Sequence, residues 1–201
     1  MIRIHACLAA FLYLLVSGVQ AETQHYFENY YGAGGGLGKV RKYCEPANRP
    51  AGFSGVCDDS NSGFRVFGGY KFNPYLGIEL GYTNFARGRR DGTPASATGL
   101  WKGYGVGLSA AAFLPLGDQV ELMAKAGIVG WNIQSPNGQL SSSSTIDDRG
   151  FSLTAGIGAT WFFIPQVGLR LEFERFQNVG DQATVGRFNV DHLSLNVVGR
   201  F

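Results

Sequence analysis

Apolar residues alternate with small or polar residues in several segments of this chain of 201 residues. Between positions 151 and 161, every second residue is Phe, Leu, Ala, Ile or Trp, and the residues between them are Ser, Thr or Gly. Segments that begin at Leu76, Val167 and Leu193 show the same period of two. Because successive side chains of a strand point to opposite faces of a sheet, each segment predicts a β-strand with one apolar face and one small or polar face.

The connections between the predicted strands alternate strictly in length. The eight expected strands cover residues 28–41, 63–72, 75–86, 100–115, 119–132, 150–163, 166–176 and 188–201. Tight turns lie at residues 72–75, 116–118 and 164–166. The other four connections are long and rich in Gly, Ser, Asn, Asp and Pro: residues 42–62, 87–99, 133–149 and 177–187. An up-and-down order of strands then places every long connection at one end of the sheet and every tight turn at the other.

Two architectures fit this order, a soluble barrel with an apolar interior and a barrel that crosses a membrane with its apolar face outward. A soluble barrel would carry many Lys and Glu on its water-facing side. Here the polar face is mostly Gly, Ser and Thr, and charged residues make up only 16% of the chain. After Ala21 there is no run of 18 apolar residues that would predict a spanning helix. We therefore predict an all-β fold, an eight-stranded antiparallel up-and-down transmembrane β-barrel.

Aromatic residues gather where the predicted strands meet the connections. Near the tight turns these residues are Phe72, Tyr75, Phe162, Phe163 and Phe201, and toward the long connections they are Tyr82, Phe85, Trp101, Trp131, Phe151 and Phe173. Their joint placement predicts two aromatic girdles at the membrane interfaces.

The first 21 residues predict a cleaved secretory signal peptide. Arg3 gives a positive start, residues 6–16 are apolar, and Val19-Gln20-Ala21 fits a cleavage site that has small residues. Cys7 precedes the apolar run instead of following it, which disfavours a lipid anchor. Residues 22–201 would then form the barrel domain.

The exported part holds two cysteines, Cys44 and Cys57, in a segment rich in Pro and Gly. Two thiols in an exported chain predict a disulfide. Metal binding is the alternative, but the sequence offers no third Cys after the signal peptide and no His between Tyr26 and Asp191. We expect neither a metal nor another cofactor.

The charge balance argues against a polyanionic partner. There are 17 Lys and Arg against 15 Asp and Glu, and the net charge of +2 gives no basic stripe. No nucleic acid partner is therefore expected. The glycine-rich residues 32–38 lack the Lys-Ser/Thr pair and the helix of a phosphate-binding loop.

Three motifs resemble a known family. They are NPYLGIELGY at residues 73–82, LRLEF at residues 169–173 and LSLNVVGRF at residues 193–201. These motifs resemble the eight-stranded transmembrane domain of the outer membrane protein A family, from about Tyr30 to Phe201. The resemblance implies a place in the bacterial outer membrane, among its lipids and lipopolysaccharide. Members commonly carry a peptidoglycan-binding domain after the barrel, which we expect this chain to lack because it stops at Phe201.

The last predicted strand resembles the C-terminal sequence that the barrel-assembly machinery recognises in its clients. The residues that carry this resemblance stand at alternate positions and are Leu193, Leu195, Val197 and Phe201. Gly199 departs from the pattern, because an aromatic or large apolar residue is usual at that position.

The polar face of the strands collects charged residues that would lie inside the barrel: Arg65, Lys71, Glu79, Glu121, Lys125, Arg170, Glu172, Glu174 and Arg200. Charges in a narrow lumen must pair, and we expect one network of Glu79, Lys125, Arg170 and Glu172. In the family that the chain resembles, a glutamate that matches Glu79 and an arginine that matches Arg170 belong to a cluster that can block or open the lumen.

Two other members of that family cluster are missing from this chain. The family's lysine on the fourth strand falls at Ala111, and its glutamate on the sixth strand falls near Ala159 and Thr160. A static polar plug is therefore favoured over a gate, because eight strands leave a bore that side chains just fill.

One motif suggests an enzyme, because His192-Leu193-Ser194 resembles the His-x-Ser of lipid A deacylases. A catalytic triad also needs a carboxylate that orients the histidine and a position that faces the lipid substrate. His192 and Ser194 lie on the predicted inward face, and no Glu follows them.

The predicted function is therefore non-enzymatic. The protein would contribute to envelope structure through a mostly plugged barrel, and its four long connections would contact extracellular ligands in adhesion or host interaction. A narrow low-conductance channel for small solutes and a lipid A-modifying enzyme remain the alternatives.

Overall fold

The computed structural model describes residues 27–46, 54–93, 99–136, 145–180 and 187–201. The described residues form one antiparallel sheet of nine strands. The strands are β1 (Glu28–Val40), β2 (Ser54–Asp58), β3 (Ser60–Asn73), β4 (Leu76–Thr93), β5 (Gly99–Leu116), β6 (Val120–Pro136), β7 (Thr145–Ile164), β8 (Val167–Val179) and β9 (Phe188–Arg200). The predicted signal peptide at residues 1–21 lies outside the described residues.

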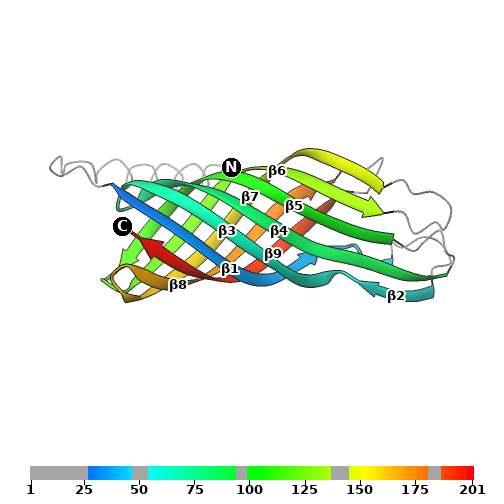
Figure 1. Ribbon diagram of the computed structural model, residues 1–201, viewed down its shortest axis with the longest axis horizontal. Helices are drawn as coiled ribbons and strands as arrows, with labels where there is room; N and C mark the ends of the chain where they lie inside the picture. The colour runs from blue at the N-terminus through cyan, green and yellow to red at the C-terminus, as the bar shows by residue number, and fades with distance from the viewer. Residues whose placement is uncertain (1–26, 47–53, 94–98, 137–144, 181–186) are drawn as a thin grey trace, which may run out of the picture.

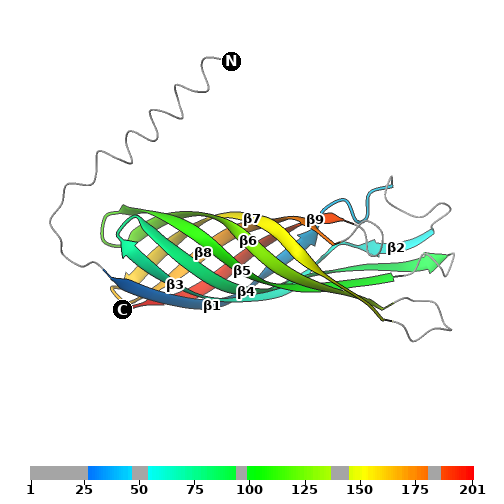
Figure 2. The ribbon, with the colours of Figure 1, turned by 90° about the horizontal axis from the view of Figure 1, so that it is seen from above.

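Eight of these strands close into a barrel. Each strand from β3 to β9 pairs with the next one along the chain, and β1 joins the two ends of this series because it pairs with both β3 and β9. The short strand β2 pairs with the far end of β4 and takes no part in the closure. Figures 1 and 2 show a long, narrow barrel whose strands are tilted against its axis, as closure of a sheet requires. The predicted fold is confirmed.

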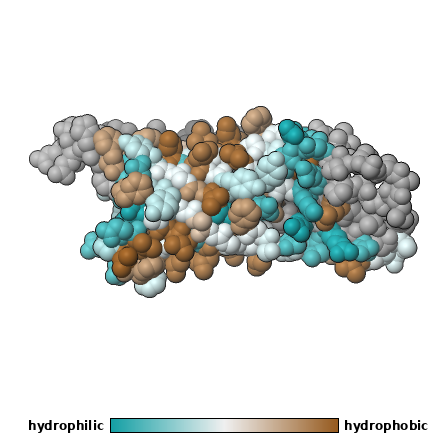
Figure 3. All heavy atoms as spheres, in the orientation of Figure 1, coloured by the Kyte–Doolittle hydropathy of each residue, from teal (hydrophilic) through white to brown (hydrophobic). Residues whose placement is uncertain are grey.

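The period of two in the sequence sorts side chains between the two faces of the barrel. Leu80 and Leu171 point outward and are 56% and 53% exposed. Figure 3 shows apolar side chains over the middle of the barrel and hydrophilic residues toward the end that carries the long connections. The inward residues are small where neighbouring strands approach closely. At Gly127, an added Cβ would lie 2.6 Å from the Cα of Ser109.

The tight turns follow from local residue chemistry. The Asn73 side-chain oxygen accepts hydrogen bonds from the backbone N–H groups of Tyr75 and Leu76, at 2.8 and 2.9 Å. This Asx turn reverses the chain between β3 and β4. Gly117 has a φ of 77°, which a glycine adopts without strain, and it lies between β5 and β6.

The long connections at residues 87–99 and 133–149 were predicted as loops, and this is wrong over much of their length. β4 continues to Thr93 and β5 begins at Gly99, while β6 continues to Pro136 and β7 begins at Thr145. The connection at residues 42–62 likewise contains β2 and the start of β3, and β8 reaches Val179 in the connection at residues 177–187. Beyond the membrane, β4 pairs with β5 and β6 pairs with β7, and we call these two paired extensions ribbons. Strand pairing satisfies their backbone groups even where both faces meet water, so the ribbons need no apolar alternation.

Three aromatic residues assigned to the girdles face the lumen instead. Phe85, Trp131 and Phe162 are all at least nine-tenths buried. Each stands on the inward side of its strand, Phe85 and Trp131 toward the long connections and Phe162 beside the tight turn between β7 and β8. Among the described residues, no helix is long and apolar enough to cross a membrane.

Candidate functional site in the barrel lumen

Six charged side chains meet in the middle of the lumen. The cations are Arg65 on β3, Lys125 on β6 and Arg170 on β8, and the carboxylates are Glu79 on β4 and Glu172 and Glu174 on β8. None of the six side chains is more than 4% exposed. We call these six residues the central network. Its three positive and three negative charges balance, which is the condition for burying ions in a narrow space.

Glu79 is the hub of the central network. Its Oε1 lies 2.7 Å from an Arg65 guanidinium nitrogen and 3.0 Å from the Lys125 Nζ. Its Oε2 lies 3.0 Å from the Arg170 Nη1 and accepts a hydrogen bond from the Tyr30 hydroxyl at 3.2 Å. One carboxylate therefore contacts cations from three strands.

The other two carboxylates lie next to each other along β8. Glu174 pairs with Arg65 and, at 3.0 Å, with Lys125, and it also accepts a hydrogen bond from the Thr154 hydroxyl at 2.8 Å. Glu172 pairs with Lys125 and lies 3.6 Å from the Arg65 Nε. Positions 170, 172 and 174 share one face because the strand period is two, so a single strand supplies half of the network.

A second charge cluster lies nearer the tight turns. Lys71 pairs with Glu121 at 2.6 Å and with Glu28 at 2.7 Å. Its Nζ also lies 4.5 Å from the centre of the Phe113 ring. This cation is buried, and two carboxylates and an aromatic face offset the loss of water.

Apolar side chains fill the lumen on both sides of the central network. On the side of the tight turns the buried cluster consists of Tyr30, Phe67, Ala111, Phe113, Met123 and Val198. On the side of the long connections it consists of Val40, Tyr43, Phe85, Val129, Trp131, Ile133, Phe176, Val179 and Val190. The Phe85 and Phe176 rings meet within this second cluster at 4.7 Å between centroids. Ions are thus held between two apolar layers.

Little space remains beside the central network. A cavity lined by Arg65, Glu79 and Glu174, among other residues, has a volume of about 10 Å³. Such a volume holds about one water molecule. Side chains therefore fill the described lumen at this level.

Cys44 and Cys57 form a disulfide with a Cα–Cα distance of 5.7 Å, as the sequence predicts. Both half-buried cysteines pack against the apolar cluster on the side of the long connections. The bond ties the segment after β1 to β2, which itself pairs with the far end of β4. Its structural effect is to hold Tyr43 and its neighbours over the mouth of the barrel.

The structure brings together all four residues of the network predicted from the sequence, and it adds two that the sequence analysis did not place there. Arg65 contacts all three carboxylates, and Glu174 contacts two cations. Both residues stand at inward positions in the alternation. The alternation already places both among the lumen residues, but it does not identify their partners.

His192 and Ser194 both point into the lumen and are 1% and 2% exposed. Among the described residues, neither ring nitrogen of His192 has a hydrogen-bond partner. The Ser194 hydroxyl accepts a hydrogen bond from the Asn196 side-chain amide at 3.0 Å. No described cluster of His, Cys, Asp or Glu could hold a metal ion.

The closed barrel, its apolar outer face and its polar interior define a transmembrane β-barrel of the bacterial outer membrane. The family model described as the OmpA-like transmembrane domain matches residues 24–201. The chain belongs to this family.

Curated relatives include outer membrane protein A of Klebsiella pneumoniae, which is 33% identical over 180 residues, or 87% of this chain and 52% of that protein. Outer membrane protein A of Escherichia fergusonii is 32% identical over 151 residues, or 74% of this chain and 42% of that protein. The chain thus spans about half the length of these relatives or less.

Solved structures of the same fold include Ail of Yersinia pestis, determined with the heparin analogue sucrose octasulfate. It is 18% identical, with a TM-score of 0.53 over 87% of this chain and 99% of that one. Neisserial surface protein A is also 18% identical, with a TM-score of 0.54 over 87% of this chain and 96% of that one. At this identity the likeness concerns the fold alone.

Proposed function

We propose that this protein is a non-enzymatic outer-membrane barrel whose lumen is closed by its own side chains, and that it acts through envelope structure and through contacts made by its extracellular end. The observation that carries the proposal is the layered lumen. A balanced network of six buried charges lies between two apolar clusters, and the cavity that Arg65, Glu79 and Glu174 line has a volume of about 10 Å³.

Planar-bilayer recording tests the closed lumen. The full barrel, inserted into a planar bilayer at neutral pH, should show no stepwise conductance, because a hydrated ion has to cross both apolar layers and the paired charges between them. The double variant Phe85→Ala/Phe176→Ala, which lacks the ring pair of one apolar layer, is recorded beside the unaltered protein for comparison. Regular conductance steps from the unaltered protein would support the channel alternative instead.

The position of His192 and Ser194 supports a non-enzymatic function. A lipid acyl ester approaches the barrel from its outer face, whereas these two side chains lie buried inside it. Two charged residues are close to His192 in the sheet or in the chain. Glu174 on β8 is its register partner, and Asp191 precedes it in the sequence. The Glu174 carboxylate is engaged by Arg65 and Lys125, so it does not orient the histidine.

Contacts at the extracellular end are supported by the ribbons that extend beyond the barrel. The β4–β5 ribbon continues past the register pair Arg87 and Lys102, and the β6–β7 ribbon continues past Gln134 and Asp147. The described parts of both ribbons carry exposed charged residues. Such paired strands present side chains to a ligand from a stable frame.

Trimming the two ribbons tests this part of the proposal. Residues 88–101 and 135–146 are each replaced by Asn-Gly, which joins register partners through a two-residue hairpin turn. The trimmed barrel should still fold, because the strands inside the membrane are unchanged. In a deletion strain, it should restore envelope integrity but not adhesion to host cells or matrix. Full adhesion by the trimmed barrel would contradict the proposed role of the ribbons.

We further propose that Leu193, Leu195, Val197 and Phe201 form the sequence that the barrel-assembly machinery recognises. All four side chains point outward on β9 or at its end. The Tyr31 ring of β1 lies over Gly199, where an added Cβ would be 2.9 Å from the ring, and it packs on Phe201 at 5.7 Å. An aromatic side chain from the neighbouring strand thus covers the position that lacks one.

A further inference from the structure

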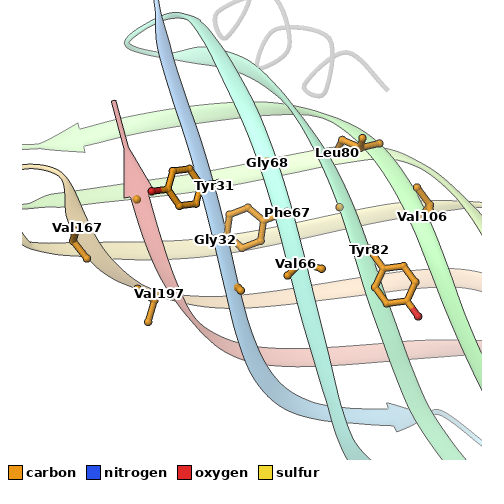
Figure 4. A pocket seen from close by; sticks show the side chains of 13 residues that line it. Tyr31, Gly32, Val66, Phe67, Gly68, Leu80, Tyr82, Val106, Val167 and Val197 are labelled. Carbon is orange, nitrogen blue, oxygen red and sulfur yellow. The ribbon is translucent and has the colours of Figure 1, made fainter.

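A shallow apolar groove runs along the outer face of the barrel. It has a volume of about 660 Å³ and is lined by residues of β8, β9, β1, β3, β4 and β5 (Figure 4). Its floor contains residues with little or no side chain, among them Ala33, Gly68 and Gly81. Tyr31 borders it toward the tight turns and Tyr82 borders it toward the extracellular end. Since this face lies within the bilayer, the groove meets hydrocarbon.

Two cations lie side by side beyond the extracellular end of the groove. Arg87 on β4 and Lys102 on β5 are register partners, and both are exposed. Below them on the same two strands, Tyr82 and Tyr104 stack at 5.8 Å between ring centroids. Arg87 lies seven residues beyond Leu80 on β4. At about 3.3 Å per residue along a tilted strand, this span exceeds half the height of an apolar band about 25 Å tall, so the cations stand at the level of lipid headgroups.

No carboxylate in the described part of the chain forms an ion pair with either of these two cations. Among the described residues, Arg87 and Lys102 form no ion pair, whereas Arg89 pairs with Asp91 at 2.6 Å. Like charges directly opposite each other in a sheet are destabilising. A register shift between Asn84 and Arg87 sets the level at which the two meet, and bulges of this kind re-aim side chains. An anion that contacts both cations would remove the repulsion.

We propose that this face binds a phosphorylated, multiply acylated glycolipid, the lipid A anchor of lipopolysaccharide. One phosphate lies between Arg87 and Lys102, and one acyl chain lies in the groove beyond Tyr82. The cations stand on the extracellular side, and lipid A is the anionic lipid of that leaflet. This inference rests on the outer-membrane location and is independent of the closed lumen and of adhesion.

Native mass spectrometry of the full barrel in detergent tests the headgroup contact. The probe is lipid A that carries two phosphates, and the comparisons are the dephosphorylated lipid and phosphatidylglycerol. The double variant R87Q/K102Q should bind the diphosphorylated lipid about thirtyfold more weakly, at about fivefold for each lost cation. The matched control R41Q/R187Q also removes two exposed extracellular cations, but neither of them lines the groove. It should bind the lipid as the unaltered protein does.

A glycine pair tests the groove. Gly68→Leu places a side chain on the groove floor, where an added Cβ would have only an ordinary contact at 3.8 Å. Gly35→Leu is the matched control, because Gly35 is also outward, has the same kind of contact at 3.9 Å and does not line the groove. Gly68→Leu should weaken lipid A binding about fourfold, as for one buried methylene group, and Gly35→Leu should not.

Four results would overturn the proposal. Equal loss in R87Q/K102Q and R41Q/R187Q would mean that only total charge matters, and equal loss of phosphatidylglycerol binding would assign the face to anionic lipids in general. Equal effects of the two leucine variants would remove the groove from the site. A change in oligomer mass with Gly68→Leu, at constant lipid binding, would assign the groove to a second copy of the chain. The far-UV circular dichroism of each variant checks that it is folded.

Discussion

Replacing Glu79 with glutamine should lower the free energy of unfolding by about 3–5 kcal/mol, because it leaves three buried cations facing two carboxylates. Arg170→Met should also be costly, since three carboxylates then face two cations. The double variant keeps two of each sign, Arg65 and Lys125 against Glu172 and Glu174, so its charges balance again. Its cost should therefore be smaller than the sum of the single costs, with a coupling of about 1–3 kcal/mol.

Urea unfolding in lipid vesicles measures the free energy of unfolding of the two single variants and of the double variant, each relative to the unaltered protein. The control is Arg149→Gln at the extracellular end, where Arg149 and its partner Asp147 are 74% and 40% exposed. An exposed pair contributes little, so this change should leave unfolding nearly unaltered and should add independently to Glu79→Gln. Strictly additive costs for Glu79→Gln and Arg170→Met would mean that the 3.0 Å contact between them carries no coupling.

Placing arginine on the outer face of the barrel should have the second largest effect. Leu80→Arg and Leu171→Arg should each cost about 2–4 kcal/mol, because both side chains point into the hydrocarbon near its middle. Val56→Arg is the matched control. Val56 is 72% exposed, but it belongs to β2, which pairs with the far end of β4 and takes no part in the barrel closure.

The same unfolding measurement separates these cases. Val56 meets water, so its replacement by arginine should cost much less than either leucine change. If Leu80→Arg and Val56→Arg cost the same, Leu80 would not face lipid. Water-accessible spin labels at Leu80 or Leu171 would contradict the assignment in the same way.

Local pattern predicted the faces of the strands and the ends of the barrel. The period of two placed Glu79 and Arg170 inward and Leu80 and Leu171 outward without any knowledge of their neighbours. The alternation of short and long connections then gave an up-and-down order and separated the two ends. Both inferences depend on residues close together in the chain, where strand geometry alone decides the direction of a side chain.

Pairing inside the lumen could not be derived in the same way. Arg65 and Glu174 are 109 residues apart, and they meet only because eight strands close with one particular stagger. The inward face of Phe85, Trp131 and Phe162 has the same origin, since an aromatic residue near a strand end fits either a girdle or a lumen layer. Strand length beyond the membrane was also missed, because paired ribbons in water need no apolar face.

Period, spacing and compartment were sufficient to predict the class of fold, the two faces of each strand and the Cys44–Cys57 bond. The folded barrel was needed to show which charges share the lumen, how the two apolar layers enclose them, and that Arg87 and Lys102 stand together above the groove. Register and closure are collective properties of all eight strands, so no single segment encodes them. A shift of one residue in any pair would change every contact across the barrel while leaving the local pattern as it is.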